Sequence, residues 1–261
     1  MSHARTHYVI LFQGRAGSSY LIDALGRLPG VVASGEDLTE LAPPSGSMLR
    51  RLRWLVRPAV GDTPAGVQFA YTRWFYEARW EGAQAVGFKT KVKDIYDHEM
   101  LGRLLNEFDV RAIVLERRNL VKQAVSRLNA ARLHEERRQW NRRTGDASLG
   151  PFEADPELFD RMLRRVVFSQ DMLDSFIAYL GAPTLRLEYE ELERDRATWF
   201  GSICQFLGLP PVEPTSGLGK NTPDDLRAVL LNFDALRAQY RGTPYAMMFE
   251  EATASGDEGA T

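Results

Sequence analysis

Residues 13–20, Gln-Gly-Arg-Ala-Gly-Ser-Ser-Tyr, are the part of this 261-residue chain best suited to binding an anion. An apolar run precedes them and an amphipathic helix pattern follows, which predicts a strand, a glycine-containing turn and a helix. Such a turn directs backbone N–H groups and the positive end of the helix toward one point, where phosphate and sulfate-like groups bind. Arg15 adds a guanidinium fork suited to an oxyanion, and Ser18 and Ser19 add hydroxyls that could also cap the helix.

This loop differs from two common nucleotide-binding patterns. A Walker loop has four residues between its first Gly and a Gly-Lys-Ser/Thr sequence, but only two residues separate Gly14 from Gly17, and no Lys follows Gly17. The dinucleotide pattern Gly-x-Gly-x-x-Gly is not met either. An ordinary strand-to-helix turn capped by a serine is the alternative that these residues alone leave open.

A second basic segment follows another apolar run. Residues 112–115, Ala-Ile-Val-Leu, have the composition of a buried parallel strand, and a helix pattern begins shortly after them. Arg118 lies at the end of this strand, and Ser126 lies eight residues later, about two turns into the helix. The two side chains could bind one phosphate, although a basic strand end and an ordinary helical serine explain the same pattern.

Together the two segments resemble those of the sulfotransferases that use 3′-phosphoadenosine 5′-phosphosulfate (PAPS). That family holds the 5′-phosphosulfate with a Pro-Lys/Arg-Ser-Gly-Thr/Ser loop after the first strand, which residues 15–19 match, with Arg15 in the basic position. It holds the 3′-phosphate with an Arg-Asn-Pro segment and a Ser eight residues after the Arg, and residues 118–126 match this spacing. The resemblance implies that the donor PAPS and its product 3′-phosphoadenosine 5′-phosphate (PAP) are bound by Arg15, Ala16, Gly17, Ser18, Ser19, Tyr20, Arg118 and Ser126.

The resemblance covers about residues 7–250 and is nearest to bacterial carbohydrate sulfotransferases of the nodulation-factor and trehalose type. Residues 187–192, Leu-Glu-Tyr-Glu-Glu-Leu, resemble a strand-ending segment of the family, so Tyr189 is expected to contact the adenine, a buried structural tyrosine being the alternative. Two positions depart from the pattern, because Gly14 and Leu120 stand where Pro is usual. Lys220 is the nearest counterpart of a basic C-terminal segment and is expected to contact the donor.

The general base is expected to be a carboxylate. Cytosolic animal members use the His of a Lys-Thr-His segment, but the corresponding residues here are Lys89-Thr90-Lys91. Some bacterial carbohydrate members use a Glu soon after the first helix, and Glu36 is in that position; an exposed loop carboxylate is the alternative. We expect its pKa to be raised by burial or hydrogen bonding. Lys89 is expected to steady the sulfuryl group, and Lys91 to point to the opposite face of the sheet.

The pattern of elements predicts a P-loop-like, three-layer α/β fold with a central parallel sheet flanked by helices. Apolar strand-like runs lie near 8–12, 84–88, 111–115 and 183–188, and helical patterns lie near 18–28, 97–107, 119–138 and 156–181. We expect a single domain over 1–251, with a helical insert around 42–83 and a disordered tail over 252–261. The insert contains Trp54, Trp74 and Trp80, which could form an acceptor wall or pack as a helical subdomain.

The composition of the chain bears on which kinds of ligand and partner it can bind. The net charge of −2 argues against general nucleic-acid binding, which favours basic domains. We expect no transmembrane segment and a cytoplasmic location, since the first residues lead directly into a strand. The four His residues are scattered, so no metal is expected, and the single Cys204 lies in an apolar helix pattern that predicts a core residue. The charged segment 132–143 is read as a solvated helix face, with an acceptor lid as the alternative.

The sequence therefore predicts an enzyme that moves a sulfuryl group from PAPS to a hydroxyl of a carbohydrate or glycolipid. Its catalytic residues would be Glu36, Arg15 and Lys89. Two other functions stay open: a non-catalytic nucleotide-binding module, and a nucleotide-dependent kinase, against which the missing Gly-Lys-Ser/Thr sequence counts. The identity of the acceptor and the oligomeric state, a homodimer included, also stay open.

Overall fold

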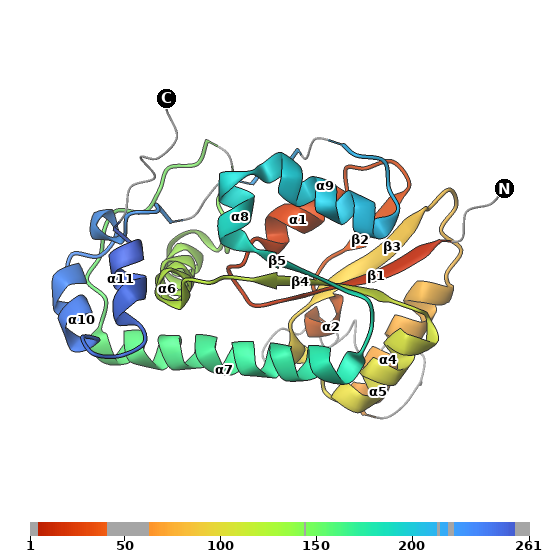
Figure 1. The fold of residues 1–261 in the computed structure, drawn as a ribbon, viewed down its shortest axis with the longest axis horizontal. Coiled ribbons are helices and arrows are strands. Elements are labelled where there is room, and N and C mark those ends of the chain that lie inside the picture. The colour runs from red at the N-terminus through yellow and green to blue at the C-terminus, as the bar shows by residue number, and fades with distance from the viewer. Residues whose placement is uncertain (1–4, 41–62, 144, 213–214, 219–221, 254–261) are drawn as a thin grey trace. The chain divides into compact units, whose positions relative to one another are not determined.

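The computed structural model describes residues 5–40, 63–143, 145–212, 215–218 and 222–253. The chain divides into two compact units, one formed by Met1–Glu116 and Asp171–Ser216 and the other by Arg117–Gln170 and Gly217–Thr261. The first unit contains the sheet, and the second is helical (Figure 1).

The first unit is built on five parallel strands in the order β2-β3-β1-β4-β5. The strands are β1 (Thr6–Phe12), β2 (Val31–Ser34), β3 (Ala85–Thr90), β4 (Arg111–Glu116) and β5 (Thr184–Glu188). Helices α1 (Ser18–Leu25), α8 (Tyr189–Arg194) and α9 (Arg196–Leu207) lie on one face of this sheet, and α4 (Pro64–Glu77) and α5 (His98–Glu107) lie on the other (Figure 1). Two short elements, α2 (Asp37–Glu40) and the 3₁₀ turn η1 (Val92–Asp94), follow β2 and β3.

Alternation along the strands divides the core of this unit into two layers. In β1, Val9 and Leu11 pack with α4 and α5, whereas Tyr8 and Ile10 pack with α1 and α9. Successive side chains of a strand point to opposite faces, so a strand buried on both sides must be apolar throughout. This explains why the strands were visible as continuous apolar runs. Cys204 lies in the second layer, fully buried, as predicted.

The second unit has an apolar core of its own. Its helices are α6 (Leu120–Arg137), the first part of α7 (Pro156–Leu180), η2 (Leu226–Ala228), α10 (Phe233–Gln239) and α11 (Ala246–Glu251). Val121 and Val125 of α6 pack there with Phe159 of α7 and Phe249 of α11. Asn119 starts α6 by accepting a hydrogen bond from the Lys122 amide at 2.9 Å.

The prediction of a central parallel sheet flanked by helices is confirmed, and the four predicted strands and four long helices are all present within a few residues of their expected bounds. The edge strand β2 was not predicted, because it has only four residues and none is fully buried. Within the expected insert, Pro64–Glu77 form α4, but 41–62, with Trp54, lie outside the described residues, as do most of 252–261. The single-domain interpretation stays a prediction.

Gly87 should be indispensable to the sheet. It pairs with Tyr8 in the register of β1 and β3, and a Cβ at residue 87 would overlap the carbonyl oxygen and ring of Tyr8. We expect Gly87→Ala to lower the free energy of unfolding by about 3 kcal/mol, because a packed sheet cannot relieve the overlap. Gly201→Ala in α9 is the control, since its Cβ would meet nothing within 4 Å. Chemical denaturation measures both, and equal stabilities would contradict the argument.

Candidate active site

The carboxyl ends of the parallel strands bring four loops of the first unit to one edge of the sheet. The loop after β1 leads to α1, the loop after β2 carries Glu36, the residues after β3 carry Lys91, and Tyr189 follows β5 directly. Ligands of open α/β sheets bind at this edge. The sheet therefore gathers the first-unit residues that the sequence singled out.

The loop between β1 and α1 is held in a left-handed conformation that opens the start of the helix. Arg15 and Gly17 have φ values of 75° and 84°, and Ala16 between them is fully buried. Gly17 is the N-cap, so the cap has no side chain, and the expectation that Ser18 or Ser19 caps the helix is wrong because both lie inside it. The N–H groups of a first helical turn have no carbonyl partner within the helix, and they face an approaching anion.

Tyr189 closes one side of this loop. A Cβ added at Gly17 would lie 3.0 Å from the ring carbon Cδ2 of Tyr189 and 3.3 Å from Leu192. Gly17 is thus required twice, for its positive φ and for the close approach of this ring. Tyr20 lies in the first turn of α1. Its ring packs against the core, and the Arg196 guanidinium carbon lies 5.2 Å from the ring centroid.

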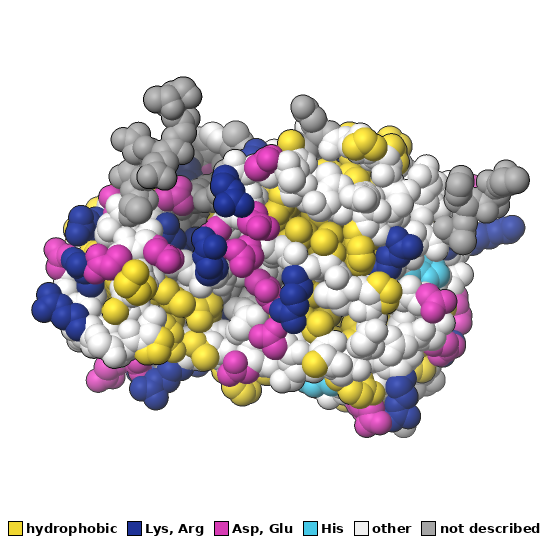
Figure 2. Space-filling view, in the orientation of Figure 1, with side chains coloured by type: hydrophobic (Ala, Val, Ile, Leu, Met, Phe, Trp, Pro, Cys, Tyr) yellow, Lys and Arg dark blue, Asp and Glu magenta, His cyan; other side chains and the backbone are white. Residues whose placement is uncertain are grey.

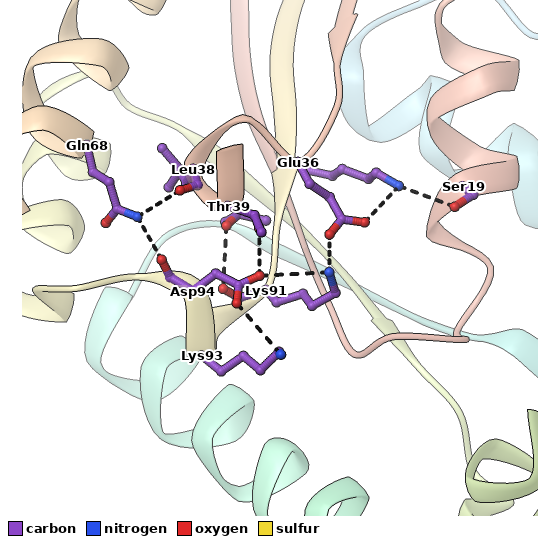
Figure 3. A network of polar contacts seen from close by, with 10 residues as sticks. Ser19, Glu36, Leu38, Thr39, Gln68, Lys91, Lys93 and Asp94 are labelled. Atoms are coloured by element: carbon purple, nitrogen blue, oxygen red, sulfur yellow. Dashed lines mark hydrogen bonds and ion pairs between the residues drawn. The ribbon is translucent and has the colours of Figure 1, made fainter. Parts of the chain in front are cut away.

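Glu36 lies between two lysines. The Lys89 ammonium is 3.4 Å from Glu36 Oε1 and donates a hydrogen bond to Ser19 Oγ at 3.3 Å, while Lys91 donates to Glu36 Oε2 (Figure 3). Both ammonium groups also face the Phe12 ring, at 5.2 and 5.3 Å from its centroid. One carboxylate is therefore tied through Lys89 to the first turn of α1.

This arrangement sets the charge states of Glu36 and Lys89. Burial raises the pKa of the Glu36 carboxyl, but the ammonium groups of Lys91 and Lys89 together lower that pKa below its ordinary value. Burial lowers the pKa of Lys89; Glu36 raises it, and Lys91 and Arg15 lower it again, so it stays below its usual value. The expected raised pKa of Glu36 is wrong, because the sequence did not reveal that both lysines contact it.

The expectation that Lys89 and Lys91 point to opposite faces of the sheet is also wrong. Residues two apart in a strand point to the same face, so alternation would not separate Lys89 from Lys91. In addition, β3 ends at Thr90, and Lys91 belongs to the turn that follows. Both side chains consequently reach Glu36. Lys91 also lies 3.8 Å from Asp94 Oδ2, a contact that sequence reasoning missed although the i, i+3 spacing suggested it.

The candidate 3′-phosphate residues belong to the second unit and are described there by themselves. Arg118 is exposed and precedes Asn119, the N-cap of α6. Ser126 is buried in the second turn of α6, where its hydroxyl accepts a hydrogen bond from Thr222 at 3.5 Å. Asn129, one turn further on, donates to the same Thr222 hydroxyl at 3.4 Å. The helix therefore has a polar stripe that includes Ser126, and Lys220 lies outside the described residues.

Among the described residues no group of three or more His, Cys, Asp or Glu side chains could hold a metal ion, and none of the described helices is long and apolar enough to cross a bilayer. Acidic and basic side chains are interspersed on the face shown in Figure 2. In the charged segment 132–143, Trp140 stacks on His134 with ring centroids 4.2 Å apart.

Solved structures share this architecture. A sulfotransferase from Alicyclobacillus acidocaldarius aligns over 95% of this chain and 94% of its own, with a TM-score of 0.50 and 17% identity. The chain has the sulfotransferase fold. Two further structures align less well. A sulfotransferase domain from the Synechococcus PCC 7002 olefin synthase aligns over 97% of this chain and 95% of its own, with a TM-score of 0.45 and 20% identity. Mouse sulfotransferase SULT7A1 complexed with PAP aligns over 95% of this chain and 89% of its own, with a TM-score of 0.42 and 13% identity. No family model and no curated protein matches the chain.

The ion pairs of Glu36 should stabilise the protein in a pH-dependent way. Because its folded pKa is lowered, the contribution is present above the ordinary carboxyl pKa of 4.5 and is lost as the pH falls through the folded value. At pH 7 we expect Glu36→Gln to cost about 1–3 kcal/mol of unfolding free energy, since two lysines lose their carboxylate. Denaturation of both proteins between pH 3 and 7 should show the difference shrinking below pH 4.5, with exposed Glu153→Gln as control. A pH-independent difference would contradict the ion-pair account.

Proposed function

We propose that the protein is a sulfotransferase that moves a sulfuryl group from PAPS to a hydroxyl group of a carbohydrate or glycolipid. The observation that carries the proposal is the double contact of Lys89, which joins Ser19 in the first turn of α1 to the carboxylate of Glu36. An anion cradle and a base are thereby linked by one ammonium group. The residues fit such a donor, because the left-handed Arg15–Gly17 loop exposes the start of α1 toward an anion.

Each residue has a role that follows from its charge. The Glu36 carboxylate takes the proton of the acceptor hydroxyl as its oxygen bonds to sulfur. The sulfur–oxygen bond to the 5′-phosphate breaks at the same time, and its electron pair stays on the phosphate oxygen. Arg15, the helix end and Lys89 face the negative charge that develops there. Bound PAPS would supply the sulfuryl group and leave as PAP.

The lowered pKa of Glu36 is compatible with this role. In a loose transition state the acceptor oxygen forms little bond before the old one breaks, so its proton leaves late. A base of modest strength is then sufficient, provided that it is ionised and correctly placed. The two lysines keep Glu36 ionised at neutral pH, where the enzyme would work.

The carbohydrate acceptor is supported by the surroundings of Glu36. The next residue, Asp37, accepts a hydrogen bond of 2.6 Å from the Tyr71 hydroxyl of α4. A carboxylate and the aromatic side chain that binds it, placed directly after a base, suit a ring rich in hydroxyl groups.

Titration calorimetry with PAP and with ATP, each without metal and again with magnesium, tests the donor class. We expect micromolar binding of PAP and none of ATP, because the Arg15–Gly17 loop lacks the lysine that cradles a triphosphate chain. Absence of PAP binding, or preference for ATP with magnesium, would overturn the proposal in favour of a kinase or another binding module.

The same titration of Arg118→Ala, with PAP and with adenosine 5′-phosphate, tests which residues recognise the 3′-phosphate. We propose that Arg118 and Ser126 bind the 3′-phosphate, so the variant should weaken PAP about 10- to 100-fold and leave adenosine 5′-phosphate unaffected. Exposed Arg241→Ala is the matched control. Equal losses for both nucleotides would remove this role of Arg118.

Glu36→Gln should separate binding from catalysis. We expect PAP affinity to stay within about threefold of the native value, while turnover falls about 10²- to 10⁴-fold, because the amide cannot take a proton. The measurement is release of PAP from PAPS in the presence of a panel of carbohydrate acceptors. Unchanged turnover would exclude Glu36 as the base and leave the donor assignment standing.

A further inference from the structure

A second carboxylate, that of Asp94, lies beside the lysines that contact Glu36. Asp94 Oδ2 lies 3.8 Å from the Lys91 ammonium, and its other oxygen lies 3.8 Å from exposed Lys93 (Figure 3). Lys91 therefore stands between Glu36 and Asp94. Glu36 and Asp94 carry two negative charges, and Lys89 and Lys91 carry two positive ones. Without Asp94, Glu36 alone would face both ammonium groups.

Asp94 is itself held in place. The Thr39 hydroxyl donates a hydrogen bond of 2.6 Å to Asp94 Oδ2, the oxygen that faces Lys91. The buried amide of Gln68 on α4 donates to the backbone oxygens of Leu38 and Asp94, at 3.1 and 2.7 Å, and accepts from the Tyr96 amide at 3.0 Å. Gln68 thus joins the turn that follows Glu36 to the turn that follows Lys91.

We propose that Asp94 is a positioning residue that acts through Lys91. Because Asp94 also forms an ion pair with the Lys91 ammonium, that ammonium neutralises the charge of Glu36 only in part. This inference rests on the proposed role of Glu36 as the base. A carboxylate that faces two ammonium groups without a competitor accepts a proton less readily. Asp94 would therefore preserve the basicity of Glu36 while the lysines keep it ionised.

The other charged groups around Glu36 do not replace Asp94. Asp37 is turned to the Tyr71 hydroxyl, and Arg15 acts on Lys89 in the same direction as Lys91. Lys93 is mostly exposed, where solvent screens its charge. Among the described residues, Asp94 is the carboxylate besides Glu36 that forms an ion pair with Lys91.

The test is a titration of Glu36 in the native protein and in Asp94→Asn, without donor or acceptor. The side-chain carboxyl signal of Glu36 is followed by carbon-13 NMR and assigned by its absence in Glu36→Gln. Loss of the neighbouring negative charge should lower the proton affinity of Glu36 about threefold or more. The ammonium of Lys89 should also lose its proton at lower pH, which gives a second reading on the alkaline side.

Thr39→Val and Asp97→Asn complete the design. Thr39→Val removes the hydroxyl that fixes Asp94 and should shift both titrations in the same direction by less. Asp97→Asn makes the same charge change three residues away, at the N-cap of α5, and should leave both in place. Unchanged or raised proton affinity of Glu36 in Asp94→Asn would overturn the inference, as would an equal shift in Asp97→Asn. Since the titration needs no nucleotide, failure of PAP binding would sink the sulfotransferase proposal and leave this result intact.

Discussion

A lysine ammonium that is almost fully withdrawn from water has to be compensated, and Lys89 imposes this constraint on the whole site. Its side chain is only 7% exposed, and burial already lowers its pKa. An unpaired charge in such a place is costly, so partners must come from elsewhere in the chain. Ser19 supplies a hydroxyl from α1, Glu36 a carboxylate from the turn after β2, and Phe12 the face of a ring from the end of β1. One buried charge thus fixes three segments relative to one another.

The parallel sheet makes this compensation geometrically simple. Because every strand runs in the same direction, the turns after β1, β2 and β3 emerge at the same edge without any long excursion of the chain. β1 and β3 are buried on both faces, and the half-buried β2 pairs with β3 at one side of the sheet. The left-handed loop at Arg15 and Gly17 follows the buried end of β1, and the Tyr189 ring packs against Gly17.

How far the sequence leads depends on whether the determining contacts are local. The strands and long helices were predictable, since apolar runs and helical periodicity are read within a few residues. The strand, turn and helix formed by β1 and α1 were predictable for the same reason, although Gly17 rather than a serine proved to be the N-cap. By contrast, the Lys91–Glu36 pair joins residues 55 apart and the Gln68–Asp94 bond joins residues 26 apart, distances over which no periodic pattern exists. The expected pKa of Glu36 was wrong in direction because these long-range contacts could not be seen in the sequence.

The electrostatics of the site also favour one division of labour between the two lysines. Lys91 faces two carboxylates, so its charge is already balanced and is poorly available to a substrate anion. Lys89 shares Glu36 and otherwise contacts a neutral hydroxyl, at the helix end where an anion would bind. In the mechanism that we propose, Glu36 takes up a proton and loses its charge, so the ammonium of Lys89 would lose its counterion at the moment when the leaving phosphate gains negative charge. Proton transfer to Glu36 and stabilisation of the leaving group would then be coupled by Coulomb's law alone.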